Sequence, residues 1–177
     1  MVPAKNVLET GFEGGGAMLH PIPSLMNINR TDMGEPYDYY MEGITPSIAK
    51  LVSACDEERL AVCRALGLNV PPLIKSLQKM YKLTQEDMYE LLQNNKAYVG
   101  VKSPMNLKHR FIVEDTVSGI VPLASIGNML GVNTPIMNAF IEIASVVCGR
   151  DFRSEGRTAE KLGLNGKTLQ EIYAMIS

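Results

Sequence analysis

The stretch TPSIAKLVSACDEERLAVCRALGL, from Thr45 to Leu68, decides the fold class of this 177-residue chain. Its Thr-Pro opening is typical of a helix start, because a threonine hydroxyl can accept a free backbone N–H and proline suits the first helical position. Apolar side chains follow at helical spacing, at Ile48, Leu51, Val52, Cys55, Leu60, Cys63 and Leu66. With Gly67 placed to end it, the stretch predicts one long helix with an apolar face.

The same signals predict further helices along the chain. The expected elements are a helix over 72–81, one capped by Thr84 and ending near 94–95, one from Thr134-Pro135 to Gly149, and a terminal helix opened by the capping box of Thr168 and Glu171. Strand signals are confined to residues 97–101 and 111–113, which are short enough to be ends of helices. The sequence therefore predicts an all-α, multi-helix domain with little or no strand.

The first 42 residues differ, because glycines and prolines replace the helical periodicity. An irregular segment is expected over 1–42, with one helix at 23–29. Gly14-Gly15-Gly16 is not a dinucleotide-binding loop, since such a loop follows a buried strand and opens a helix. We expect it to be a flexible approach to His20. The tripeptide at 166–168, Gly-Lys-Thr, matches only the tail of a phosphate-binding loop and predicts a turn.

Composition and charge exclude several classes of function. The net charge of −2 shows no excess of the basic residues that bind nucleic acid or an anionic membrane. The longest apolar stretches, such as 136–147, are interrupted by polar residues and fall short of the ~20 apolar residues that cross a bilayer. The N-terminus lacks the apolar core of a secretory signal, so no such signal is predicted.

The cysteines and histidines do not form the pattern of a metal site. Cys55, Cys63 and Cys148 are never paired as C-x-x-C, and each lies in an apolar pattern. With only His20 and His109 beside them, no zinc or other metal site is predicted. Three reduced cysteines packed in helices are expected, and a cytoplasmic location follows as the default expectation.

Two regions carry candidates for acid/base chemistry. His20 is flanked by apolar residues, so a half-buried ring is expected, and the local sequence alone favours a packed imidazole bonded to a backbone carbonyl. Arg110 and Asp115 are five residues apart, about 140° around an ideal helix, and face one site only if the backbone changes direction between them. The local sequence alone favours Asp115 as the N-cap of a helix that reaches Leu130.

Four segments of the chain carry a more specific pattern in a fixed order. They are NVLETGFEGGGAMLHP (6–21), YYMEGITPSIAKLVSACDEERLAVCRALGL (39–68), HRFIVEDTVSGIVPLASIGNMLGVNTP (109–135) and EGRTAEKLGL (155–164). The most specific pieces are the His-Pro pair, the EGIT-P start and the Arg-to-Asp spacing before GIVPLA. Together they resemble the C-terminal helical domain of the opine dehydrogenase family, which includes octopine and nopaline dehydrogenases.

The resemblance implies that residues 1–177 form the helical substrate domain of a two-domain dehydrogenase, of the type that follows a Rossmann domain. The Rossmann domain, which binds NAD or NADP, is absent from this chain, so no reductase activity is expected from the chain alone. The family joins an α-keto acid to the amino group of an amino acid, and a hydride reduces the imine. By position, His20 would match the catalytic histidine, Asp115 its carboxylate partner, and Arg110 the arginine that faces the keto acid's carboxylate.

The implied partners are an amino acid, a keto acid and a Rossmann domain supplied in cis or in trans. Two alternatives stay open at this point. One is a non-catalytic helical module that mediates association, for example as a homodimer. The other is a 2-keto acid reductase domain that works without amino-acid condensation.

Overall fold

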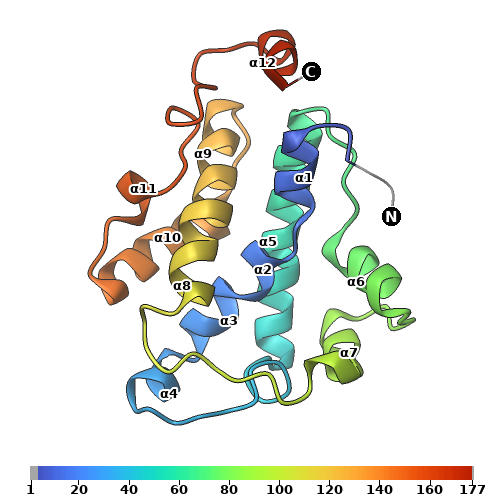
Figure 1. Cartoon of the computed structure of the whole chain (residues 1–177), viewed down its shortest axis with the longest axis vertical. Helices are drawn as coiled ribbons and strands as arrows, with labels where there is room; N and C mark the ends of the chain where they lie inside the picture. The colour runs from blue at the N-terminus through green and yellow to red at the C-terminus, as the bar shows by residue number, and fades with distance from the viewer. Residues whose placement is uncertain (1–3, 177) are drawn as a thin grey trace.

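The computed structural model describes residues 4–176, and within that range it contains helices and no strand, which confirms the all-α prediction (Figure 1). In chain order the helices are α1 (Val7–Glu13), α2 (Gly16–Leu19), α3 (Pro21–Met26), α4 (Ile28–Asp32), α5 (Pro46–Ala65), α6 (Leu73–Tyr81), α7 (Met88–Gln93), the 3₁₀ turn η1 (Lys96–Tyr98), α8 (Arg110–Asp115), the π-helical turn η2 (Thr116–Ile120), α9 (Val121–Met129), α10 (Pro135–Cys148), α11 (Phe152–Glu155) and α12 (Leu169–Ile176).

Helix α5 is the long helix that the Thr45–Leu68 stretch predicts. The Thr45 hydroxyl accepts the N–H of Ile48 at 3.3 Å, and Gly67 follows the last turn with φ of +76°, a conformation that favours glycine. The helix contacts α2, α3, α7, α9 and α10. Its predicted apolar face is buried, since Val52, Cys55 and Cys63 have no exposed surface. Helix α5 is therefore the centre of the core.

One turn of α5 also buries three charged side chains. Arg59 is 1% exposed, and its Nε donates to Asp56 Oδ1 at 2.7 Å. The same guanidinium donates to the carbonyl of Phe12 at 2.7 Å, in the last turn of α1, and to that of Pro71 at 2.9 Å, just before α6. Asp56 Oδ2 in turn accepts the N–H of Leu73 at 2.8 Å, at the start of α6. This pair therefore holds α1 and α6 against α5.

Glu58, on the same turn, holds α10. Its two carboxylate oxygens accept the N–H groups of Ile136 and Met137 at 2.7 and 3.0 Å. An anion at this position also suits the positive end of the helix dipole. The predicted helix start at Thr134-Pro135 is confirmed, but the Thr134 side chain makes no capping bond, and Glu58 from α5 supplies the acceptor instead.

Most other predicted helix boundaries hold, with one further correction. Helix α6 covers the expected range, Gly149 ends α10 at φ of +61°, and the Thr168–Glu171 capping box opens α12. Helix α7 is capped by Asp87, whose Oδ1 accepts the N–H of Glu90 at 3.0 Å, and not by Thr84. Residues 84–87 are not helical, and the carbonyl of Gln85 accepts the side-chain amide of Gln78 at 2.6 Å.

The N-terminal segment is more regular than expected. It contains four short helices, α1 to α4, where one helix over 23–29 was predicted. Pro21 and Pro23 lie in the first turn of α3, where a missing N–H breaks no helical bond, so they start a helix instead of interrupting it. Figure 1 shows α2 and α3 between α5 and the α8–α9 run. Helix α2 contacts α5, α8 and the π turn η2, and α3 contacts α5 and α8.

Helices α8 and α9 form one continuous helical run with a π turn in the middle. The Val121 N–H bonds to the carbonyl of Thr116, one residue further back than in an α-helix. Pro122 explains the turn, because a proline inside a regular helix lacks an N–H and collides with the preceding turn. The carbonyl of Val117 accepts the N–H of Arg157 at 2.9 Å instead of a helical partner. The strand signal at 111–113 lies within α8.

Among the helices of residues 4–176, none is both long enough and apolar enough to span a bilayer. The three cysteines are free, and Cys55 and Cys63 are buried.

Replacing Arg59 with methionine tests the buried charge network. We expect Arg59→Met to lower the free energy of unfolding by about 3–5 kcal/mol, because it leaves the Asp56 carboxylate buried without its cation. Urea unfolding followed by circular dichroism measures the change. Arg64→Met, on the exposed side of the same helix, is the matched control and should stay within about 0.5 kcal/mol. Equal stability of the two variants would contradict the assigned role.

Candidate active site

His20 lies at the junction of two short helices. It ends α2 and precedes Pro21, the first residue of α3. Its carbonyl accepts the backbone N–H of Ser24 at 3.2 Å and the hydroxyl of Tyr39 at 2.5 Å. The backbone of His20 is therefore fixed by α3 and by the segment that leads into α5.

The imidazole of His20 is bonded at both nitrogens to side chains. Nδ1 lies 2.9 Å from Oδ2 of Asp115, which is 95 residues away in the sequence, and Nε2 lies 3.2 Å from the hydroxyl of Tyr40. The structure thus brings together the predicted pair of His20 and Asp115. The alternative of a ring bonded to a backbone carbonyl is wrong, because the partners of both nitrogens are side chains.

The chemistry of these partners assigns the proton on the ring. An ionised carboxylate can only accept, so Nδ1 carries a hydrogen and donates it to Asp115. In the neutral imidazole Nε2 is then the acceptor, and the Tyr40 hydroxyl donates to it. A carboxylate that fixes the tautomer in this way leaves Nε2 as the atom that gains and loses a proton.

Aromatic rings enclose the rest of the imidazole. The ring of Phe111 stacks on His20 at 4.1 Å between centroids and 13° between planes. Tyr39 lies against the edge of His20 at 6.4 Å. The side chains of His20 and Asp115 are 20% and 21% exposed, so the pair is mostly buried and still reaches solvent.

The last glycine of the run packs against this pair. Gly14 ends α1, Gly15 precedes α2, and Gly16 is the first residue of α2. A Cβ on Gly16 would lie 3.2 Å from Oδ1 of Asp115 and 3.6 Å from Nδ1 of His20. Gly16 is therefore closely packed, because a side chain at this position would require the Asp115 carboxylate to shift.

Asp115 reaches His20 from the last position of α8. It makes no capping bond, and helical structure precedes it, so its alternative assignment as the N-cap of a helix to Leu130 is wrong. Arg110 is at the first position of α8, and its Nε lies 3.5 Å from Oε2 of Glu114 on an exposed face. Within the described residues the structure thus pairs Arg110 with Glu114 and not with Asp115.

Two members of the site were not found from the sequence. Tyr40 and Phe111 both lie inside segments that carry the family resemblance, but neither has a local signal for contact with His20. Burial raises the pKa of Tyr40 to about 12, so its hydroxyl stays protonated at neutral pH. The adjacent Tyr39 is fully buried, and burial holds its pKa well above the usual value.

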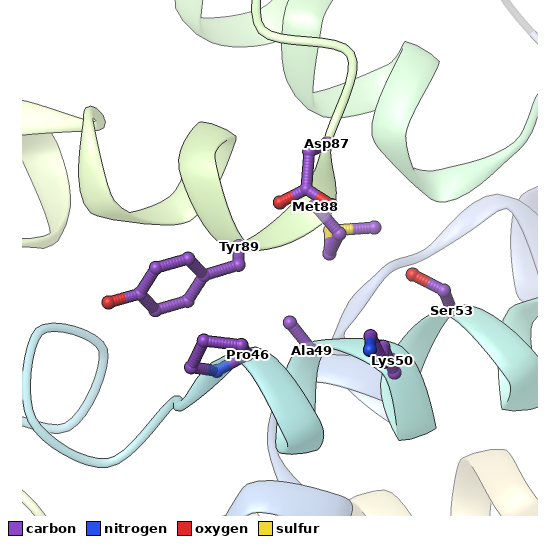
Figure 2. A pocket seen from close by; sticks show the side chains of 7 residues that line it. All are labelled: Pro46, Ala49, Lys50, Ser53, Asp87, Met88 and Tyr89. Atoms are coloured by element: carbon purple, nitrogen blue, oxygen red, sulfur yellow. The ribbon is translucent and has the colours of Figure 1, made fainter.

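The pocket in Figure 2 lies away from this pair. Figure 2 shows Pro46, Ala49, Lys50 and Ser53 along α5, facing Asp87, Met88 and Tyr89 at the start of α7. It has a volume of about 320 Å³. One carboxylate oxygen of Asp87 accepts the N–H of Glu90 and so caps α7.

Adding a methyl group at Gly16 tests the packing of the pair. We expect Gly16→Ala to push the Asp115 carboxylate away from Nδ1, because the new Cβ lies closer to Oδ1 than ordinary contact allows. The Nδ1 proton of His20 should then exchange faster with water, as seen by NMR. Gly14→Ala is the control, since nothing lies within 4 Å of a Cβ there. Equal exchange in both variants would contradict the close approach.

A second test concerns His109, the N-cap of α8. Its Nδ1 accepts the N–H of Phe111 at 3.3 Å, which requires an unprotonated nitrogen. Burial, together with the charges of Arg110 and His20, lowers the pKa of His109. A lowered pKa means that the unfolded chain binds the proton more readily, so this stabilisation is complete above pH ~6.5 and is lost as the pH falls below that value.

We therefore expect His109→Asn, a cap that does not titrate, to lose less stability than the unmodified chain between pH 7.5 and pH 5. Urea unfolding at a series of pH values measures the difference. The carboxylates are common to both proteins, so the comparison isolates His109. The same pH dependence in both proteins would show that this cap does not depend on protonation.

Comparison with known proteins agrees with the sequence pattern. A family model described as NAD/NADP octopine/nopaline dehydrogenase, alpha-helical domain, matches residues 3–148. An opine dehydrogenase of Arthrobacter sp. (strain 1C) is 41% identical over 99% of this chain and 49% of its own length. Protein ocs of Agrobacterium tumefaciens (strain Ach5) is 27% identical over 94% of this chain and 47% of its own length.

Solved structures show the same fold. An octopine dehydrogenase described with NADH and L-arginine superposes with a TM-score of 0.75 at 20% identity, over 96% of this chain and 49% of that one. A structure of octopine dehydrogenase with NADH and agmatine gives the same values. The chain spans about half the length of these relatives. It belongs to the octopine/nopaline dehydrogenase family and corresponds to the alpha-helical domain of that family.

Proposed function

We propose that this chain is the substrate-binding and acid/base part of an NAD(P)H-dependent opine-type dehydrogenase. The reaction joins an α-keto acid to the amino group of an amino acid and reduces the resulting imine. The observation that carries the proposal is the 2.9 Å contact of His20 and Asp115, two residues that the fold brings together from distant segments in a chain of this family. The substrate classes follow from relatives whose structures are described with L-arginine and with pyruvate.

In this proposal His20 holds and moves the proton. A carbonyl oxygen or an imine nitrogen must gain a proton as the neighbouring carbon is reduced, and a protonated imidazole supplies one. Asp115 accepts the Nδ1 hydrogen and keeps the proton exchange at Nε2. Its negative charge also stabilises the imidazolium. Phe111 and Tyr39 fix the plane of the ring, so the acid is already oriented when substrate arrives.

Arg110 is proposed to bind the carboxylate of the keto acid. Its guanidinium presents paired donors that match a carboxylate. Its ion pair with Glu114 is exposed, so solvent screening weakens it. A substrate carboxylate that enters the site would compete with Glu114 for the same donors. Binding in this way would fix which face of the substrate carbon is reduced.

The residues described do not fit a dinucleotide site. Residues 4–176 contain no strand, so they lack the strand, glycine loop and helix that cradle a pyrophosphate. We therefore propose that NAD or NADP, the source of the hydride, is bound mainly by a Rossmann domain outside this chain. No residue of the chain is assigned to it.

A cytoplasmic location belongs to the same proposal. The three cysteines are free, as expected in a reducing compartment. Burial raises the pKa of the thiols of Cys55 and Cys63, which makes them unreactive packing residues.

The test joins this chain to the nucleotide-binding half of the 41% identical Arthrobacter opine dehydrogenase. We expect oxidation of NADH or NADPH that requires both a keto acid, such as pyruvate, and an amino acid. His20→Ala and Asp115→Asn should each lower kcat by about 10²–10⁴-fold, the usual contribution of a positioned acid. Arg110→Gln should raise KM for the keto acid by at least about tenfold.

Two controls make the result decisive. Glu57→Gln changes an exposed carboxylate on α5 to an amide and should leave the rates unchanged. NADH binding, followed by fluorescence, confirms that the nucleotide-binding half is folded. An assembly that binds NADH but reduces no substrate, or full activity in His20→Ala, would refute the proposed function. Reduction of the keto acid without any amino acid would identify a simple keto acid reductase instead.

A further inference from the structure

Both nitrogens of the proposed acid are already engaged within the protein. Nδ1 of His20 is held by the Asp115 carboxylate, a charged acceptor that gives a strong bond. Nε2, the nitrogen left for proton exchange, faces the hydroxyl of Tyr40 at 3.2 Å. A substrate can therefore exchange a proton with His20 only after the Tyr40 bond is broken, or through the Tyr40 hydroxyl itself.

Tyr40 is held in a way that disfavours breaking this bond. The residue is 5% exposed, and its ring stacks on Tyr98 at 3.9 Å with 12° between the planes. Tyr39 packs against its edge at 5.1 Å, and the side-chain amide of Gln93 donates to its carbonyl at 3.0 Å. Swinging the hydroxyl away from Nε2 would disrupt this stack. Proton movement along the existing hydrogen bond requires no such rearrangement.

A hydroxyl is suited to pass a proton because it donates and accepts at once. With neutral His20, the Tyr40 hydroxyl donates to Nε2. With protonated His20, Nε2 donates to the Tyr40 oxygen, and the hydrogen of the hydroxyl becomes available to another acceptor. The pKa of Tyr40, raised to about 12 by burial, keeps that hydrogen in place at neutral pH.

We propose that the Tyr40 hydroxyl is the group through which His20 exchanges its proton with the reacting atom of the substrate. This inference rests on the proposed function. As the Nε2–H bond breaks, a new O–H bond forms on Tyr40, and the original O–H bond breaks as its proton joins the carbonyl oxygen or imine nitrogen. Tyr40 ends unchanged, the substrate has gained one proton, and His20 is neutral with Nδ1 still bonded to Asp115. Tyr40 is thus a catalytic residue, and Asp115 is the positioning residue behind His20.

The test compares Tyr40→Phe with Tyr98→Phe in the two-domain assembly described above. Both changes remove one buried hydroxyl from the same stack, but the Tyr98 hydroxyl bonds to Tyr81 and not to His20. We expect Tyr40→Phe to lower kcat by about 10²–10⁴-fold with KM changed less than twofold. Tyr98→Phe should change kcat by less than about threefold.

Two further measurements separate a proton relay from a structural role. In single turnovers, the rate of hydride transfer in mixtures of H₂O and D₂O should curve with the deuterium fraction, because two protons move in one step. In the chain itself, the ¹⁵N signal of Nε2 of His20 should move toward that of a free acceptor in Tyr40→Phe and stay in place in Tyr98→Phe.

Each other outcome overturns the relay. A normal kcat in Tyr40→Phe, a linear dependence on deuterium, equal losses in both variants, or an unmoved Nε2 signal would do so. None of these would touch the proposed function, provided that His20→Ala still abolishes activity. Full activity in His20→Ala would instead refute the proposed function itself.

Discussion

The buried ion pair of Asp56 and Arg59 is the interaction on which the arrangement of the other helices depends. The Arg59 guanidinium binds a carbonyl in the last turn of α1 and a carbonyl just before α6, and the Asp56 carboxylate binds the first N–H of α6. Buried charge is stable only when every donor and acceptor is satisfied, so the geometry of this turn leaves little freedom to its partners. The position of Phe12 is fixed as a result, two residues before the glycine run.

The fixed end of α1 also helps to position the residues of the candidate site. Because the end of α1 is fixed, Gly16 meets Asp115 at close range and His20 follows at the α2–α3 junction. From the other side, Glu58 holds α10, and the π turn lets one helical run include both Asp115 and Pro122. The candidate site thus lies between segments that Arg59 and Glu58 hold in place. The imidazole of His20 is held at both nitrogens and on one face, so it needs little reorganisation to exchange a proton.

Local signals predicted the parts of this fold that local chemistry determines. The Thr45 cap, the apolar periodicity of α5 and the terminal Gly67 all act within one helix. The cap of α10 was not predictable in the same way, because Glu58 lies 78 residues from Ile136. The sequence around Glu58 indicates only a solvent-exposed carboxylate. The same holds for Asp56 and Arg59. Packing of distant segments, and not helix propensity, decides where these charges go.

The site shows the same division, and it also supplies the most direct test. Only the family resemblance linked His20 to Asp115, and no local pattern indicated Tyr40. The central claim is that Asp115 accepts the Nδ1 hydrogen and leaves Nε2 for proton exchange. The ¹⁵N shifts of His20 in the unmodified chain, recorded where the ring is neutral, test it directly. The structure predicts the tautomer protonated at Nδ1, whereas a ring protonated at Nε2 would contradict the assignment of His20 and Asp115.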